Sequence, residues 1–220
     1  MYCMATAAAT TDTGLSLSAS YTYTDDLLTK LSTPSTDYTF TYGAFGLRTK
    51  VKAGGVTLAN YTYEAETNYL TKLDYGNGDS VNYTYNQQGQ VISQTYEDGD
   101  THTYRYDNNG ELASVTDSDS GVTQYYIYDQ IGRPGQYRER GGEWDTTLTY
   151  KYNKYNQLTK VTETIADRTC TISATYDDDN RVTSVTADKA SRTYGYDGFS
   201  RINSRVTKHN GSTLLTDTLT

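Results

Sequence analysis

The sequence is poor in the residues that usually form a hydrophobic core. Leu, Ile, Val and Phe together make 34 of the 220 residues, and the net charge is −8. This combination would normally indicate a disordered chain. Tyrosine, however, occurs 24 times. Each tyrosine can bury on the order of 150–250 Å² while its hydroxyl keeps a polar partner, so we expect a tyrosine-rich sheet that folds without an aliphatic centre.

Basic residues are also scarce, with 19 Lys and Arg against 27 Asp and Glu. Nucleic acids and anionic membranes are recognised through basic patches, so neither is expected as a partner. No apolar run reaches the length of a membrane span, and we therefore predict no membrane insertion. The first fifteen residues contain neither Lys nor Arg nor an apolar stretch, and do not resemble a signal peptide.

The two cysteines, Cys3 and Cys170, are too few for a disulfide scaffold, and we expect both to be unpaired, with Cys170 as a small apolar filler of a strand. The two histidines, His102 and His209, have no nucleophile elbow or clustered metal ligands around them. No glycine-rich phosphate loop is present. We therefore predict no enzyme activity, no metal and no cofactor.

Two other features leave a choice of interpretation. Acidic segments at 117–121 and 177–180 lack the glycine and glutamate of a calcium loop, and are predicted to be turns. Trp144, the single tryptophan, follows Gly141 and Gly142, and is either a packing residue or a stacking residue for sugar.

A motif of about 20 residues recurs along nearly the whole chain. It consists of Tyr-x-Tyr or a close variant, a short polar turn and an aliphatic residue. The second aromatic marks nine copies, at Tyr23, Tyr42, Tyr63, Tyr85, Tyr106, Tyr128, Tyr152, Tyr176 and Tyr196. A period in this range indicates stacked units that need their neighbours to bury a face.

The repeats alternate with period two, which predicts strands, and the two tyrosines of a pair then share one face. A turn follows each pair. Asp107 and Gly110 delimit one such turn, and Asp129 and Gly132 another, because Asp or Asn opens a turn and Gly or Asn closes it at positive φ. A second turn lies between repeats, so each repeat is predicted to be a β-hairpin with strands of roughly seven residues.

The aliphatic residues after the turn are harder to place. Leu158 and Val161 are three positions apart, which would put them on opposite faces of an ideal strand. Either a bulge intervenes or the first residue lies beneath the turn, and the sequence leaves both possibilities open.

Three copies carry the pattern Tyr-Asp-x-x-Gly/Asn/Ser-Arg. These are Tyr128-Asp129 with Arg133, Tyr176-Asp177 with Arg181, and Tyr196-Asp197 with Arg201. The chain resembles Rhs and YD-repeat proteins, which include bacterial Rhs polymorphic toxins, shell components of Tc toxins and the teneurin YD shell. The resemblance implies an all-β fold of tandem antiparallel hairpins, forming a curved, open segment of a spiral shell.

The predicted organisation is an N-terminal tail or partial repeat at 1–14, followed by about nine repeats at 15–220. The resemblance implies a non-catalytic wall segment of a larger secreted or cell-surface protein. Its expected partners are further YD repeats, a core-associated domain and an enclosed C-terminal toxin-like polypeptide. A carbohydrate- or cell-surface-binding module, with glycans as partners, is the alternative.

The first and last residues of the turn are matched in type. Asp opens the turns that end with Arg, as in Asp177 and Arg181, whereas Asn opens those that end with Gln, as in Asn153 and Gln157. We expect the two side chains to bond across the turn or to the adjacent hairpin. Asp107 with Glu111 is an exception. The repeats at Tyr23, Tyr42 and Pro134 depart from the pattern and are expected to be distorted copies or edge copies.

Overall fold

The computed structural model describes residues 2–10 and 16–219, with side chains described from residue 18 onward. These residues divide into two units, Met1–Thr103 and Tyr104–Thr220. The predicted boundary between a tail at 1–14 and the repeats at 15–220 falls on residues outside the described ranges, as does the side chain of Cys3. That boundary stays a prediction.

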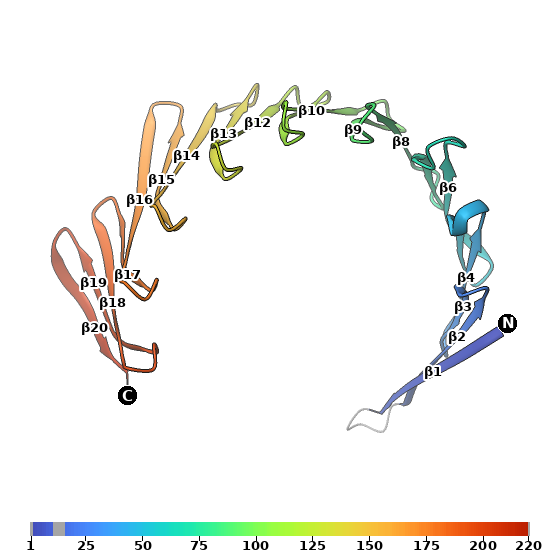
Figure 1. Cartoon of the computed structure of the whole chain (residues 1–220), viewed down its shortest axis with the longest axis horizontal. Helices are drawn as coiled ribbons and strands as arrows, with labels where there is room; N and C mark the ends of the chain where they lie inside the picture. The colour runs from blue at the N-terminus through green and yellow to red at the C-terminus, as the bar shows by residue number, and fades with distance from the viewer. Residues whose placement is uncertain (1, 11–15, 220) are drawn as a thin grey trace. The chain divides into compact units, whose positions relative to one another are not determined.

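Unit 1 is a meander in which each strand pairs antiparallel with the next along the chain (Figure 1). Its strands are β1 (Tyr2–Thr10), β2 (Ser16–Thr24), β3 (Leu27–Ser32), β4 (Asp37–Tyr42), β5 (Arg48–Ala53), β6 (Val56–Tyr63), β7 (Leu70–Tyr75), β8 (Ser80–Tyr85), β9 (Val91–Tyr96) and the start of β10 (Thr101–Tyr106). A single 3₁₀ turn, η1 (Ala44–Gly46), replaces the regular turn after Tyr42, where the sequence predicted a distorted repeat.

Unit 2 continues the same pattern, with consecutive strands again paired antiparallel. Its strands are β11 (Leu112–Asp117), β12 (Thr123–Tyr128), β13 (Pro134–Arg140), β14 (Thr146–Tyr152), β15 (Leu158–Ile165), β16 (Arg168–Tyr176), β17 (Val182–Ala187), β18 (Ala190–Tyr196), β19 (Ile202–His209) and β20 (Ser212–Thr218). The prediction of an all-β chain of tandem hairpins is confirmed, and eight of the nine marker tyrosines end a strand.

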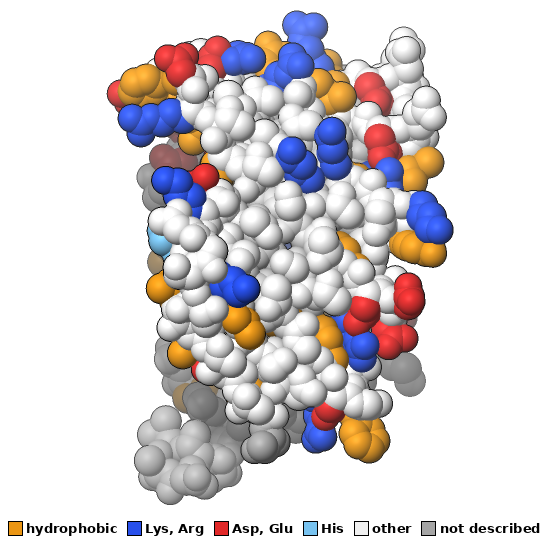
Figure 2. All heavy atoms as spheres, turned by 90° about the vertical axis from the view of Figure 1, so that its left-hand side faces the viewer, with side chains coloured by type: hydrophobic (Ala, Val, Ile, Leu, Met, Phe, Trp, Pro, Cys, Tyr) orange, Lys and Arg blue, Asp and Glu red, His pale blue; other side chains and the backbone are white. Residues whose placement is uncertain are grey.

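The two faces of each sheet differ in chemistry. Residues directly opposite one another on paired strands lie on the same face, and on one face tyrosines are opposite aliphatic residues, as Tyr150 is to Val161. We call this the tyrosine face. On the other face, Gln136, Thr149, Thr162 and Thr171 follow one another across β13 to β16. Figure 2 looks onto the side where β16 to β20 lie, and shows mostly polar uncharged side chains and backbone.

The sheets have almost no buried core. Among the described residues, Ala59 and Val81 are the buried hydrophobic side chains and Ser114 is the buried polar one, and no large side chain is fully buried. The nine marker tyrosines are half-buried, since the described strands form one layer and leave the tyrosine face without a covering layer (Figure 1). Stability must therefore come from contacts along the sheet, between one repeat and the next.

Candidate functional site

The turn after each marker tyrosine is built around its first side chain. One carboxylate oxygen of Asp177 accepts the backbone N–H groups of Asp179 (3.0 Å) and Arg181 (2.9 Å), while the other accepts the Arg181 Nε–H at 2.8 Å. Asp129 and Asp197 make the same three contacts with their own turns. The predicted pairing of Asp with Arg across the turn is thereby confirmed.

The amide turns reproduce this arrangement without charge. The Asn153 side-chain oxygen accepts the N–H groups of Tyr155 (2.9 Å) and Gln157 (3.1 Å), and its Nδ2 donates to Gln157 Oε1. Asn86 bonds to Gln90 in the same way, with 2.8 Å between Nδ2 and Oε1. Asp107 keeps the two backbone contacts, to Asn109 and Glu111. The matching of residue types seen in the sequence therefore reflects a hydrogen bond across the turn.

The fourth turn position has a left-handed backbone. Gly110 and Gly132 have φ of 83° and 80°, and Asn156, Asn180 and Ser200 have φ of 63° to 65°. Glycine and asparagine tolerate this region best, which explains the Gly and Asn of the motif. The N–H of this fourth residue donates to the carbonyl of the opening residue in each turn, for example at 3.1 Å from Asn180 to Asp177.

A β-bulge follows the turn and resolves the position of the aliphatic pair. Tyr150 is opposite Val161 and Tyr152 is opposite Leu158, so Thr159 is an extra residue in β15. Its hydroxyl donates to a backbone carbonyl of β14 at 3.1 Å. The bulge brings Leu158 and Val161 onto the tyrosine face together. The same register shift occurs at Tyr23, Tyr42, Tyr63, Tyr85, Tyr128, Tyr176 and Tyr196.

The marker tyrosines bond to the preceding repeat through their hydroxyl groups. Six of them donate to the carbonyl oxygen of the residue opposite the preceding marker tyrosine, over 2.7 to 2.9 Å. The pairs are Tyr42 with Leu28, Tyr63 with Arg48, Tyr85 with Leu70, Tyr152 with Pro134, Tyr176 with Leu158 and Tyr196 with Val182. Each of these residues lies two positions before the first residue of its strand that pairs with the following strand, as Leu158 lies before Lys160. The hydroxyl therefore takes the place of the missing ladder partner.

Two arginines that close a turn also reach the next repeat. The Arg133 guanidinium lies 4.4 Å from the centre of the Tyr152 ring, and that of Arg181 lies 4.7 Å from the centre of the Tyr196 ring. Such cation–π contacts stabilise by about 0.5–1 kcal/mol at exposed sites. Each arginine therefore joins its own turn to the tyrosine that follows.

Side chains of successive turns are bonded in series through unit 2. Arg133 Nη1 donates to the Asn156 side-chain oxygen at 2.7 Å, and Gln157 Nε2 donates to that of Asn180 at 3.1 Å. Arg181 Nη1 then donates to the Ser200 hydroxyl at 3.1 Å. In every case the fifth turn residue bonds to the fourth residue of the next turn. We call this series, from residue 129 to residue 201, the turn ladder.

The turns shift the pKa of their own acidic groups. The backbone N–H of Arg181, against a smaller opposing effect of burial, lowers the pKa of Asp177, and its guanidinium adds to the effect. The N–H of Arg201 lowers the pKa of Asp197 in the same manner. On the tyrosine face, burial and a hydrogen bond to Glu139 raise the pKa of Tyr137 to about 12.

The residues predicted from the sequence thus occupy equivalent places in successive repeats, and in unit 2 they meet across the repeat boundaries. Sequence reasoning missed the hydroxyl bonds between repeats and the bonds from one turn to the next. A signal for the first was present. The first aromatic of the pair is replaced by Phe40 or Ala174 in two repeats, whereas the second is tyrosine in all nine, which indicates a requirement for its hydroxyl.

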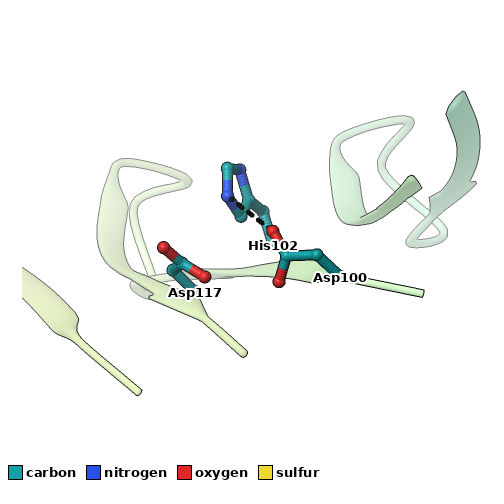
Figure 3. Close-up of side chains that lie close together, drawn as sticks. All are labelled: Asp100, His102 and Asp117. Carbon is teal, nitrogen blue, oxygen red and sulfur yellow. Dashed lines mark ion pairs between the residues drawn. The ribbon is translucent and has the colours of Figure 1, made fainter. Parts of the chain in front are cut away.

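Two other predictions concern single residues. His102 lies on the tyrosine face, as predicted, since it is opposite Gln94, which in turn is opposite Tyr83. Its Nε2 lies 3.6 Å from a carboxylate oxygen of Asp100 (Figure 3), and its ring contacts that of Tyr96. The prediction that Cys170 is unpaired is confirmed, since its thiol is free, but the prediction that it fills apolar space in its strand is wrong, since the residue is exposed.

Two segments of the chain match a known repeat family. The family model for the RHS repeat matches residues 85–122 and 176–213. No curated protein matches the chain. The described part of the chain contains no helix that could span a membrane.

Several solved structures share the fold. The TcdB2-TccC3-Cdc42 crystal structure aligns with a TM-score of 0.64 and 11% identity, over 95% of this chain and 15% of that one. TcdB2-TccC3 without its hypervariable C-terminal region gives a TM-score of 0.64 and 11% identity, over 96% and 16%. The Tc holotoxin pore of Photorhabdus luminescens gives 0.61 and 13%, over 89% and 13%. The chain thus spans about one seventh of these structures and has the fold of part of them.

Proposed function

We propose that the chain is a structural, non-catalytic stretch of shell wall in a larger secreted or cell-surface protein, because the RHS-repeat model matches two of its segments and parts of Tc-toxin structures share its fold. In this role it encloses or displays a C-terminal, toxin-like polypeptide. The fold that this chain shares with the TcdB2-TccC3 structures supports the role of a wall. One of these structures is TcdB2-TccC3-Cdc42, and another is TcdB2-TccC3 without its hypervariable C-terminal region.

The observation that carries this proposal is that every side-chain link of the turn ladder runs from one repeat to the next. Bonds of this kind let an array grow in one direction without needing a second layer. The tyrosine face is left half-exposed. Tyrosine suits such a face, since its ring offers apolar contact while its hydroxyl bonds within the wall. A polypeptide lying against the sheet would meet this surface.

Further YD repeats are the partners that the ladder favours most directly. The side chain of Arg201 has an exposed fraction of 75%, against 28% for Arg133 and 24% for Arg181. The two covered arginines are those that lie over the tyrosine of a following repeat. Repeats that supply such a tyrosine are therefore proposed as partners of this chain, together with a core-associated domain of the same polypeptide.

For a polypeptide that extends this array, the strand register predicts the position of the next marker tyrosine. Ser184 is opposite Thr193, and the marker Tyr196 lies three residues after Thr193. Ser204 is the equivalent of Ser184 and is opposite Thr218, so the next marker lies three residues after Thr218. A polypeptide that extends this array should accordingly have tyrosine at position 221 and Asp or Asn at 222. A different residue at 221 in the longer reading frame would contradict the proposal of a continuing wall.

The enclosing role is tested on that longer protein by limited proteolysis. We expect the polypeptide after the repeats to resist protease in the intact protein. Two substitutions that weaken the wall, Tyr152→Ala and Tyr176→Ala, should expose it, while Tyr155→Ala, at an exposed turn position, should not. Equal cleavage of the C-terminal polypeptide in all of these proteins would count against enclosure.

The alternative function is that of a carbohydrate- or cell-surface-binding module. It makes a separate prediction, that the isolated chain binds glycans without any enclosed polypeptide. The wall proposal does not require such binding.

A further inference from the structure

Tyr126 and Tyr137 form a pair of contacting rings within one hairpin of unit 2. They are opposite each other in the register of β12 and β13, and both lie on the tyrosine face. Their ring centres are 5.5 Å apart, and the rings are tilted by 57° to one another. This separation is within the usual range for contacting aromatic side chains. The two phenol rings are therefore neighbours in the folded chain without any change of backbone.

The two hydroxyl groups of this pair differ in the group that accepts their hydrogen bond. Tyr137 donates to a carboxylate oxygen of Glu139 at 2.8 Å, whereas Tyr126 donates to the amide oxygen of Gln124 at 3.0 Å. Glu139 and Gln124 are themselves opposite each other on β13 and β12. An ionised carboxylate can take up a proton, whereas an amide stays neutral. One phenol of the pair therefore lies beside a base and the other beside a neutral acceptor.

The surroundings of Tyr137 keep its proton on the phenol until the ring is oxidised. Burial, and after it the hydrogen bond to Glu139, raise the pKa of Tyr137 to about 12, so the phenol is protonated at neutral pH. Removal of one electron turns a phenol into a strong acid, which must then pass its proton to a nearby base. The residues opposite Glu139 on the neighbouring strands are Gln124 and Thr146, which are uncharged. The carboxylate therefore has no cation directly opposite it.

A second tyrosine pair, in unit 1, provides a comparison within the same chain. Tyr69 and Tyr85 have ring centres 4.8 Å apart, closer than those of Tyr126 and Tyr137. The hydroxyl of Tyr85, however, donates to the backbone carbonyl of Leu70 at 2.7 Å, and a backbone carbonyl does not take up protons at neutral pH. If distance alone decides reactivity, this pair is oxidised first. If proton acceptance decides it, Tyr137 is oxidised first.

We propose that Tyr126 and Tyr137 form an oxidative modification site, where a one-electron oxidant joins their rings as dityrosine and Glu139 accepts the proton of Tyr137. Each tyrosine loses one electron and one proton. The two phenoxyl radicals form a bond between the ring carbons next to the hydroxyls, and the hydrogens on these carbons then move to the oxygens. The chain loses two hydrogen atoms in all. With a haem peroxidase as oxidant, the two electrons and two protons convert one hydrogen peroxide to two water molecules.

The cross-link would act on this hairpin as a disulfide acts in other proteins. It would close the loop between β12 and β13 covalently, which restricts the unfolded chain and so favours the folded one. It would also fix the register in which Tyr126 is opposite Tyr137. The modification does not depend on the proposed role as a wall.

The site is tested by oxidising the folded 220-residue chain with Cys3→Ser and Cys170→Ser, since thiols are themselves oxidised readily. The oxidant is microperoxidase, a small haem peptide, with hydrogen peroxide. Dityrosine is followed by its blue fluorescence, and the linked peptides of the monomeric product are identified by mass spectrometry. We expect the link between Tyr126 and Tyr137 to form fastest, with a mass lower by two hydrogen atoms. In urea, where the chain is unfolded, this preference should disappear.

Variants then separate the two rings from the proton acceptor. Tyr126→Phe and Tyr137→Phe should each abolish the product. Glu139→Gln gives Tyr137 the kind of acceptor that Tyr126 has in Gln124. It should slow cross-linking about tenfold or more, since a positioned proton acceptor typically contributes about 10²–10⁴-fold. Tyr85→Phe is the matched control, because it removes a tyrosine hydroxyl from the other ring pair and should leave the rate at Tyr126 and Tyr137 unchanged.

Unfolding of each variant in urea separates lost reactivity from lost structure, and Glu139→Gln should keep its midpoint because its amide oxygen still accepts from Tyr137. An unchanged rate in this variant would overturn the role of Glu139. The comparison of the two ring pairs uses the parent chain and needs no further variant to fold. If Tyr69 and Tyr85 are linked faster than Tyr126 and Tyr137, or if the latter are not linked at all, the proposed site is overturned.

Discussion

The hydroxyl of Tyr176 donates a hydrogen bond of 2.8 Å to the carbonyl oxygen of Leu158, one repeat earlier. The ladder between β15 and β16 extends only as far as Lys160 and Ser173, and the hydroxyl supplies the partner that the backbone does not. The ring meanwhile covers part of the tyrosine face. This tyrosine therefore has two separable effects on stability, one from its hydroxyl and one from its ring.

We expect Tyr176→Phe to lower the free energy of unfolding by about 1 kcal/mol, since it removes one hydrogen bond and leaves a carbonyl without that partner. Tyr176→Ala should cost about 2–3 kcal/mol, toward the lower end for a large side chain because the ring is only half-buried. Urea denaturation followed by circular dichroism measures both, and the same order is expected at Tyr106 and Tyr152.

Tyr155→Ala provides the control, because Tyr155 is exposed to 65% at a turn tip and its loss should change stability by no more than about 0.5 kcal/mol. An unchanged midpoint in Tyr176→Phe would mean that the hydroxyl bond between repeats contributes nothing.

The charged turn and the amide turn should be interchangeable only as pairs. Asp177→Asn and Arg181→Gln each leave a mismatched turn, and each should lower the urea midpoint. The double variant recreates the pairing of Asn153 with Gln157, and should recover most of the loss. A double-mutant cycle gives the coupling directly. Losses that simply add would show that the two side chains act independently.

Stability should fall in acid because the turns hold their aspartates ionised. The pKa values of Asp177 and Asp197 are lowered from 3.8 in the folded chain, so their contribution is present above that pH. It is lost as the pH falls through the folded-state pKa values. We expect the urea midpoint to decrease below about pH 4. The variant with both turns converted to Asn and Gln should lose less of its midpoint over this range, and an equal loss would exclude these aspartates as the cause.

Much of this arrangement could be predicted from local sequence. The spacing of the tyrosines and the turn residues determine strands, hairpins and the bond between Asp177 and Arg181, because all of these join residues that are close along the chain. The bond from Arg181 to Ser200 could not be predicted. It depends on how far one hairpin is displaced from the next, which is decided by strand pairing and by the bulge.

The bulge illustrates the same limit. The odd spacing of Leu158 and Val161 indicated that something must intervene, but a residue below the turn would have satisfied the spacing equally well. The structure shows that a bulge intervenes, because Thr159 is the extra residue in β15 and its hydroxyl bonds to the opposite strand. Threonine also occupies the corresponding place at positions 29, 49, 71 and 183, a regularity that only becomes meaningful once the register is known.

Deleting Thr159 tests whether the bulge sets the faces of the sheet. Without the extra residue, Leu158 and Val161 can no longer both lie opposite a tyrosine, and one of them must turn to the polar face. Removing one aliphatic side chain from its partly buried place should cost about 1.5–3 kcal/mol. Thr159→Ala keeps the register and loses one hydroxyl bond, so it should cost about 0.5–1.5 kcal/mol.

The difference in stability between the Thr159 deletion and Thr159→Ala shows whether the bulge orients the aliphatic pair. If the deletion is no more destabilising than Thr159→Ala in urea, the strand has realigned without loss, and the bulge is then a consequence of the turn instead of a device that orients the aliphatic pair. A clearly larger cost for the deletion, with the circular dichroism of the folded state unchanged, means that the extra residue places Leu158 and Val161 on the tyrosine face.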